Sequence, residues 1–247
     1  MEKALYDNVN RLQGEHWWFA SRRRFVREVL DKAVIPDNAA ILDIGCGSGA
    51  MIDFLHNYGK FVAGIDYSVY AIKLCAEHGH KDLVRGTVEN LPFIDGAFDL
   101  ITSFEVLYHK AVGDDSKVLK EMYRVCKKGG KVLVVDSAFN FLKGKHDDFA
   151  HGARRYTVKQ LSKKLEDAGF RIRKASYIYM SIFPLLCVIR AAKNIFLPKS
   201  TSSSELHPAP RFLNDLMIKI FEAESAMLGR MGLPFGVSLI CLAEKVR

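Results

Sequence analysis

Short apolar runs alternate with helical segments over residues 39–137, and this alternation restricts the possible folds more than any other feature. Runs rich in Val, Ile and Leu predict strands, and the amphipathic stretches between them predict helices. The predicted strands are 39–45, 61–66, 81–86, 98–104 and 131–137, and the predicted helices are 50–58, 68–78 and 114–126. Such alternation predicts a parallel sheet with helices on both faces.

Beyond residue 137 the regular alternation of strands and helices changes. Residues 157–168 predict an amphipathic helix that stops at Gly169, and 170–179 and 237–245 predict two further strands. The mostly helical residues between those strands are too many for a plain loop. We therefore expect one domain over 1–247, with an N-terminal helical cap at 1–36, a sheet core at 37–179 and 233–247, and a helical insertion at 180–232.

The insertion contains an apolar stretch, residues 180–189. It is too short to span a membrane, which takes about twenty apolar residues, and Pro184 interrupts it. It fits a core helix, a subunit interface that would form a homodimer through the 180–230 helices, or a helix in peripheral contact with a membrane. A core helix or an interface is the preferred interpretation. The segment STSSSE at 200–205, with prolines on both sides, predicts a loop.

Three glycines follow the first predicted strand, in the segment ILDIGCGSGA at 41–50. Gly45, Gly47 and Gly49 allow a tight turn and a close approach of a ligand to the backbone, and the following helix begins with free N–H groups. The pattern fits nucleotide-binding proteins in general. Gly45, Gly47 and Ala50 also fit the fingerprint of dinucleotide-binding proteins.

Two aspartates help to decide between these interpretations. Asp43 lies two residues before the first glycine, where a carboxylate suits an ammonium or a sulfonium better than a pyrophosphate. Asp66 closes the next predicted strand, about twenty residues further on, where a carboxylate can accept hydrogen bonds from both ribose hydroxyls. The pair favours a positively charged nucleoside as the ligand.

Residues 38–137 resemble the class I S-adenosylmethionine-dependent methyltransferases. ILDIGCGSG and GID resemble their first two motifs, GTVENLPF at 86–93 is similar to their third segment, and FDLITSFEVLYH at 98–109 resembles the fourth. EMYRVCKKGGKVLVV at 121–135 is similar to their helix, Gly-Gly turn and fifth strand. The resemblance implies a Rossmann-like sheet of seven strands, mostly parallel with the last strand antiparallel, and a helical cap inserted between strands six and seven.

The resemblance also implies S-adenosyl-L-methionine as the cofactor. The family commonly has an aspartate at the position of Thr87, where its carboxylate accepts a hydrogen bond from the adenine amino group. The Thr87 hydroxyl is a weaker acceptor, and Glu89 could compensate for the missing carboxylate. Trp18 and Arg23, on a predicted N-terminal helix, could close over the cofactor or belong to a core and a solvated face. The expected cofactor-binding residues are Asp43, Gly45, Cys46, Gly47, Gly49, Asp66, Tyr67, Thr87, Val88, Glu89, Phe104, Trp18 and Arg23.

The flanking segments resemble stand-alone methyltransferases that act on small molecules. These segments are EHWWFASRRRFV at 15–26, HGARRYTVKQL at 151–161 and LPFGVSL at 233–239. Members of that subgroup often accompany pathways of cell-surface polysaccharides, glycolipids or natural products. The resemblance therefore implies transfer of a methyl group by in-line displacement to a small-molecule or lipid- or sugar-linked acceptor, and it does not identify that acceptor.

Methyl transfer from a sulfonium needs alignment and exclusion of water more than a catalytic triad. His109 is the candidate general base, since its ordinary pKa lies near neutrality, although it could instead be a packing residue. Arg154 and Arg155 could bind an anionic group of the acceptor, or one of them could pack while the other is solvated. The expected acceptor-binding residues are Glu105, Tyr108, His151, Arg154, Arg155 and Tyr156.

Composition limits the alternatives. The net charge of +8 allows a tRNA or rRNA methyltransferase as the second interpretation, but no motif typical of nucleic-acid methylation is present, and a nucleic-acid partner is not expected. A partner subunit that binds the cofactor without catalysis is the third. The five cysteines have no metal-ligand spacing, so we expect reduced thiols, no metal and a cytoplasmic location, consistent with an N-terminal sequence unlike a secretion signal.

Overall fold

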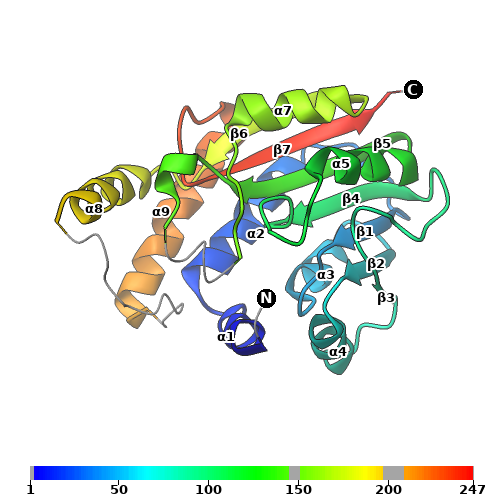
Figure 1. Ribbon diagram of the computed structural model, residues 1–247, viewed down its shortest axis with the longest axis horizontal. Coiled ribbons are helices and arrows are strands. Elements are labelled where there is room, and N and C mark those ends of the chain that lie inside the picture. The colour runs from blue at the N-terminus through cyan, green and yellow to red at the C-terminus, as the bar shows by residue number, and fades with distance from the viewer. Residues whose placement is uncertain (1–2, 145–150, 197–208, 247) are drawn as a thin grey trace.

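A seven-stranded sheet forms the centre of the computed structural model, which describes residues 3–144, 151–196 and 209–246 (Figure 1). The strand order is β3-β2-β1-β4-β5-β7-β6. Only β7 among these strands runs antiparallel to its neighbours, β5 and β6. The strands are β1 Ala40–Ile44, β2 Phe61–Asp66, β3 Leu83–Arg85, β4 Phe98–Phe104, β5 Cys126–Ser137, β6 Phe170–Ile178 and β7 Ser238–Lys245. The predicted fold class is confirmed.

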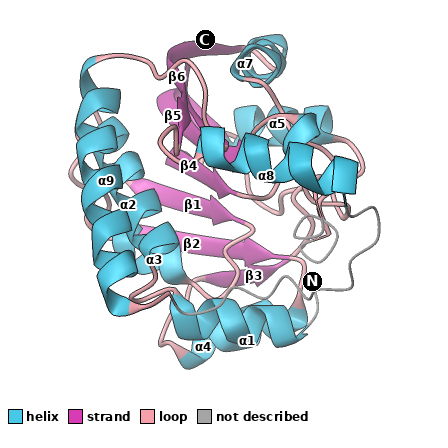
Figure 2. Cartoon of the chain, turned by 90° about the vertical axis from the view of Figure 1, so that its left-hand side faces the viewer, coloured by secondary structure: helices cyan, strands magenta, loops and turns pink. Residues whose placement is uncertain are grey.

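Helices cover both faces of this sheet (Figure 2). Ile41 and Leu100 turn to one face, where they pack with residues of α2, α3 and α9. Leu42 and Ile101 turn to the other face, where they pack with α5 and α7. The helices are α1 Lys3–Leu12, α2 Trp17–Leu30, α3 Ala50–Leu55, α4 Val69–Glu77, α5 Asp115–Val125, α7 Val158–Asp167, α8 Phe183–Phe196 and α9 Arg211–Arg230, with a 3-10 turn η1 at Asn140–Leu142.

Local signals in the sequence explain where several helices begin. The side chains of Ser68 and Asp114 accept backbone N–H groups in the first turns of α4 and α5. Thr157 and Gln160 form a reciprocal capping box at the start of α7. Each cap satisfies donors that the helix itself leaves unpaired, so the predicted starts lie within a residue or two of the observed ones.

An aromatic cluster joins the N-terminal cap to the far end of the chain. Trp18 of α2 stacks on Tyr179, which follows β6, with ring centroids 4.2 Å apart and an interplanar angle of 7°. Trp17 stacks on Phe221 of α9 at 5.4 Å. The Tyr179 hydroxyl donates to the Trp18 carbonyl at 2.9 Å. These contacts hold α2 beside α9 and over the end of the sheet.

The apolar stretch 180–189 is not a core helix, which corrects one half of the preferred interpretation, while the subunit interface stays a prediction. It contributes to α8, where Leu185 is 61% exposed and Val188 is 66% exposed. α8 lies at the edge of the molecule, and its contacts are mainly with η1 (Figure 1). None of the described helices is both long and apolar enough to cross a membrane. The predicted loop at 200–205 lies outside the described residues.

Candidate functional site

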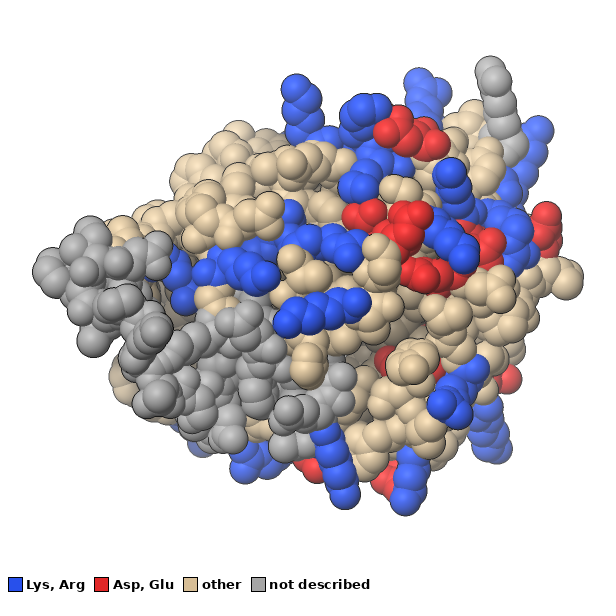
Figure 3. All heavy atoms as spheres, in the orientation of Figure 1, with Lys and Arg blue, Asp and Glu red and all other residues tan. Residues whose placement is uncertain are grey.

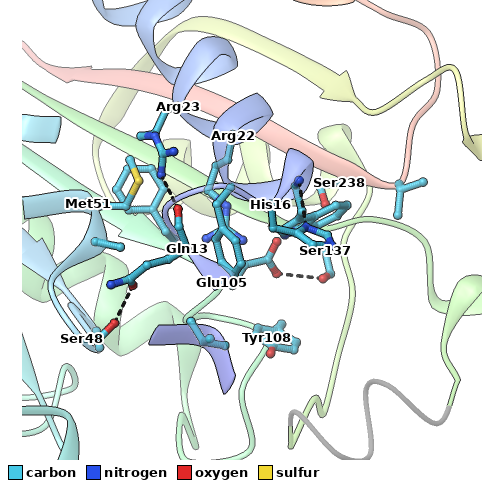
Figure 4. A pocket seen from close by; sticks show the side chains of 18 of the residues that line it. Gln13, His16, Arg22, Arg23, Ser48, Met51, Glu105, Tyr108, Ser137 and Ser238 are labelled. Carbon is cyan, nitrogen blue, oxygen red and sulfur yellow. Dashed lines mark hydrogen bonds between the residues drawn. The ribbon is translucent and has the colours of Figure 1, made fainter. Parts of the chain in front are cut away.

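A cavity of about 680 Å³ opens at the edge of the sheet where the parallel strands end (Figure 4). Its walls include residues from the ends of β1, β2, β4 and β5 and from the start of β7. β1 and β4 are neighbours in the sheet although they are distant in the chain, so the strand order reverses between them. Open α/β sheets bind their ligands at this kind of position.

The glycine-rich loop forms the floor of this cavity. Gly45 and Gly47 have positive φ angles of +69° and +58°. A Cβ on Gly45 would overlap the Val106 side chain, so only glycine fits there. A Cβ on Gly47 would meet nothing within 4 Å. The bare backbone of Gly47 therefore leaves room for a ligand beside the loop.

Asp43 lies in the wall behind the loop and is only 2% exposed. It pairs in register with Thr102 of β4, whose hydroxyl donates to Oδ1 of Asp43 at 2.7 Å. Burial raises the pKa of Asp43 to about 7, although the hydrogen bond from Thr102 and the charge of Arg22 lower it. This carboxyl can therefore change its protonation state near neutral pH, and a positively charged ligand would favour its ionised form.

Asp66 stands at the end of β2, on the other side of the loop. Its Oδ2 accepts the Gly47 N–H at 3.0 Å, and its Oδ1 accepts the Ser68 N–H at 2.8 Å. Burial raises the pKa of Asp66 above its ordinary value, and these backbone hydrogen bonds act against the rise. The loop and the two aspartates are therefore brought together at one cavity.

Residues of the N-terminal helices α1 and α2 form a further wall of the cavity. Arg22 and Arg23 reach into it from α2 (Figure 4). Arg23 donates from Nη1 to the Gln13 carbonyl at 3.0 Å, and Oε1 of Gln13 accepts the Ser48 hydroxyl at 2.8 Å. These bonds tie the segment between α1 and α2 to the glycine-rich loop. Gln13 and Tyr6 also line the cavity, but the sequence did not predict them because neither belongs to a motif.

Two acids lie where β4 and β5 end, and one of them, Glu105, lines the cavity. Glu105 has a strained φ of +57°, and its Oε2 accepts the Ser137 hydroxyl at 2.9 Å. Beneath it, Asp136 is fully buried and accepts the Tyr108 N–H at 3.2 Å. Burial, and then the neighbouring Glu105, raise the pKa of Asp136 well above its ordinary value. The neutral form of Asp136 is therefore favoured.

His109 does not line the cavity. Its Nδ1 accepts the Ala111 N–H at 3.0 Å. Burial, with the positive charges of neighbouring groups, lowers the pKa of His109 to about 4. The neutral ring therefore carries its proton on Nε2, and its basic nitrogen is engaged by the backbone.

The other predicted acceptor-binding residues separate into two groups. Glu105, Tyr108 and Arg155 line the cavity. Arg154 and Tyr156 instead face Asp115, to which the Tyr156 hydroxyl donates at 2.7 Å, and His151 lies beside His109 with ring centroids 5.8 Å apart.

The predicted cofactor-binding residues separate in the same way. Those that line the cavity are Asp43, Gly45, Cys46, Gly47, Asp66, Phe104, Trp18 and Arg23. Those that do not are Gly49, Tyr67, Thr87, Val88 and Glu89. Gly49 is the N-cap of α3, and Glu89 accepts the Asp114 N–H at 2.8 Å, next to the start of α5. The proposed contacts of Thr87, Val88 and Glu89 with adenine stay predictions.

The outer part of the cavity is built by residues that sequence analysis did not select. Leu142 of η1, Ile182 and Leu186 supply an apolar wall, and Arg190 lies at its rim. Val237 and Ser238 complete this side at the start of β7. The signal that could have found the α8 residues is their spacing of four, which puts them on one helix face.

Comparison with known proteins identifies relatives of this chain. The model of a family described as a methyltransferase domain matches residues 42–134. A Mycolicibacterium smegmatis protein named "Probable S-adenosylmethionine-dependent methyltransferase" is 26% identical over 65% of this chain and 62% of its own length. Phosphoethanolamine N-methyltransferase 3 of Arabidopsis thaliana is 30% identical over 65% of this chain and 34% of its own length. The chain thus spans less than two thirds of either relative.

A solved structure of a Thermotoga maritima SAM-dependent methyltransferase has the same fold. It superimposes with a TM-score of 0.59 at 21% identity, over 99% of this chain and 100% of that one. The correspondence extends over the N-terminal cap, the sheet and the C-terminal helices.

Proposed function

We propose that this chain acts as a class I S-adenosylmethionine-dependent methyltransferase and transfers the methyl group of S-adenosylmethionine to a small-molecule or lipid- or sugar-linked acceptor. The observation that carries this proposal is the convergence of the glycine-rich loop, Asp43, Asp66 and Glu105 on one cavity. A volume of about 680 Å³ lies within the range of small-molecule sites.

The residues around the loop fit the groups of S-adenosylmethionine. Asp66 lies where a carboxylate can accept both ribose hydroxyls, and the open backbone at Gly47 leaves space for the nucleoside. Asp43 offers a buried acid to a positive group, while Arg22 and Arg23 offer guanidinium groups to a carboxylate. When bound, S-adenosylmethionine supplies a methyl group that is already electrophilic because the sulfur is positively charged.

The chain itself has to position the acceptor and exclude water. Glu105 and Tyr108 line the cavity at the end of β4 and can orient an acceptor there. We propose that the Glu105 carboxylate receives the proton that a hydroxyl or ammonium acceptor loses. Its strained backbone and its hydrogen bond from Ser137 support this role, because both restrict the direction of the side chain.

A methyl-transfer assay tests the proposal. Protein incubated with S-adenosylmethionine labelled in its methyl group and with small-molecule, lipid and RNA fractions of a cell extract should label the small-molecule or lipid fraction. An Asp66→Ala variant is the control for label carried by contaminating enzymes. Labelled RNA alone would favour the nucleic-acid alternative. Binding of the cofactor without label in any fraction would favour a partner subunit that lacks catalysis.

The cysteines support a reducing compartment, the cytoplasm, as part of this proposal. Cys46, Cys75, Cys126 and Cys241 are buried free thiols, and Cys187 is partly buried. Buried thiols without disulfide partners are typical of proteins in reducing compartments.

A further inference from the structure

The solvent-exposed side of α8 is apolar, which reverses the usual arrangement of a surface helix. Pro184, Leu185, Val188, Ile189 and Ala191 are all exposed. At 100° per residue they cover one continuous side of the helix. Exposed apolar residues that stand singly are ordinary, but a contiguous patch of this kind marks a binding surface.

The opposite side of α8 forms a wall of the cavity. Ile182, Leu186 and Arg190 follow one another at intervals of four residues, and all three line the cavity. The same short helix thus separates the candidate active site from the exposed apolar surface. A molecule seated on that surface lies one helix width from the outer part of the cavity.

Aromatic residues extend the apolar surface beyond α8. The ring centroid of Phe183, in the first turn of α8, lies 6.1 Å from that of Phe141 and 5.2 Å from that of Phe235. Phe141 and Phe235 are themselves exposed. The patch therefore includes residues from α8, from η1 and from the segment before β7, so that three separate parts of the chain contribute to it.

The charge around this patch is positive. Among residues 180–191 and 209–214, whose side chains the structure describes, Arg190 and Arg211 are basic and none is acidic. Figure 3 shows Lys and Arg side chains next to the left-hand end of the molecule, where Figure 1 places α8, while the Asp and Glu side chains visible on this face gather farther to the right. An apolar helix face bordered by basic residues complements a bilayer that contains anionic lipids.

We propose that α8 docks on an anionic membrane surface through Leu185, Val188 and Ile189, and that the cavity behind it takes an amphiphilic acceptor from that surface. The part that concerns the acceptor rests on the proposed function. Its chemistry follows from the outer cavity, where Leu142 and Leu186 can hold an apolar chain and Arg155 and Arg190 can hold an acidic group.

Binding to vesicles tests the docking without any assay of activity. Purified full-length protein is sedimented with vesicles of phosphatidylcholine alone and with vesicles that also contain phosphatidylglycerol. We expect binding to the anionic vesicles, weaker binding to the neutral ones, and release from the anionic vesicles as salt is raised to about 0.5 M. A double Leu185→Asp, Val188→Asp variant should lose at least about tenfold in partition coefficient, because two apolar side chains can no longer enter the lipid.

Ile94→Asp is the matched control. Ile94 is 80% exposed, and it lies just before β4, at the edge of the sheet opposite to the cavity. The partition coefficient of this variant on anionic vesicles should lie within about twofold of that of the unchanged protein. Absence of binding to anionic vesicles, or equal binding of the double variant, would overturn the proposal. The proposal would also be overturned if the protein did not bind vesicles but formed a dimer that the two substitutions dissociate. A second copy of the chain would then cover α8.

The affinity for S-adenosylmethionine separates this inference from the proposed function. The double variant should bind S-adenosylmethionine like the unchanged protein, because neither substituted residue lines the cavity. Vesicle binding by a protein that fails to bind S-adenosylmethionine would overturn the proposed function and keep the docking surface.

Discussion

Asp43 shows how the local environment of one residue adapts a common motif to one kind of ligand. An aspartate before a glycine-rich loop is recognisable in the sequence, but its burial and its hydrogen bond from Thr102 are visible only in the fold. Together they leave its pKa at about 7. A positive group placed against it would favour the carboxylate over the neutral acid, so binding and ionisation are linked.

Affinity for S-adenosylmethionine should therefore depend on pH. Below about pH 7 Asp43 gains a proton and no longer attracts a positive group, so affinity should fall by up to about tenfold per pH unit. Above that pH the affinity should level off. Calorimetric titrations between about pH 5.5 and 8 measure this change. In an Asp43→Asn variant the affinity should be weaker and nearly independent of pH. This result would distinguish the titration of Asp43 from that of Asp66. If the affinity of the variant still changed with pH as in the unchanged protein, the pH dependence would come from another group.

The raised pKa of Asp43 also predicts that the stability of the folded protein depends on pH. The raised pKa means that the unfolded chain ionises Asp43 before the folded protein does. Without ligand, the free energy of unfolding should therefore decrease as pH rises from about 4 to 7, and Asp43→Asn should remove that part of the decrease.

Two candidate bases can be distinguished by substitution. Glu105→Gln should lower kcat by about a hundredfold, because the amide cannot accept a proton from the acceptor. His109→Ala should lower kcat by less than about threefold, because Nδ1 of His109 is engaged by the Ala111 N–H and the ring does not line the cavity. The opposite ranking, measured at saturating cofactor, would restore His109 as the base.

At the scale of elements, a buried acid in α9 positions the start of α8. Glu224 is 2% exposed. It accepts the Met180 N–H at 2.7 Å, and the N–H and hydroxyl of Ser181 at 2.9 and 2.7 Å. Three donors on one carboxylate fix the turn between β6 and α8, and with it the orientation of the helix that walls the cavity.

Glu224→Ala should destabilise the fold by about 3 kcal/mol, because buried N–H groups lose their acceptor. Glu222, two residues earlier in the same helix, forms a surface ion pair with Arg24 at 2.6 Å. Glu222→Ala should cost no more than about 1 kcal/mol. Urea unfolding of both variants provides the comparison. Equal losses would mean that Glu224 does not secure this turn.

The elements that sequence analysis predicted best are those specified by neighbouring residues. The segment from β1 through the glycines to α3 is local in the chain, and so are the caps at Asp114 and Thr157, which makes them recognisable from spacing alone. The cavity walls from α1, η1 and α8 are not local. Tyr6 and Leu186 line the same cavity only because the fold brings distant segments to one edge of the sheet. The exposure of α8 could not be predicted either, because an apolar sequence does not distinguish a buried helix from an exposed one.

At the scale of the whole molecule, the fold has one functional edge. The ends of the parallel strands, the segment between α1 and α2, and α8 all meet there, while α5 and α7 support the opposite face of the sheet. A ligand held at this edge contacts the N-terminal cap and the sheet together. Its binding should therefore stabilise the folded protein as a unit, by about 2.7 kcal/mol at a hundredfold excess over Kd.

The central claim is that this edge binds S-adenosylmethionine, and a calorimetric titration at about pH 8 tests it most directly. We predict saturable binding of one molecule per chain with Kd in the micromolar range, weakened at least about tenfold by Asp66→Ala, because the ribose then loses its acceptor. No heat of binding up to about 1 mM, for either S-adenosylmethionine or its demethylated product, would contradict it.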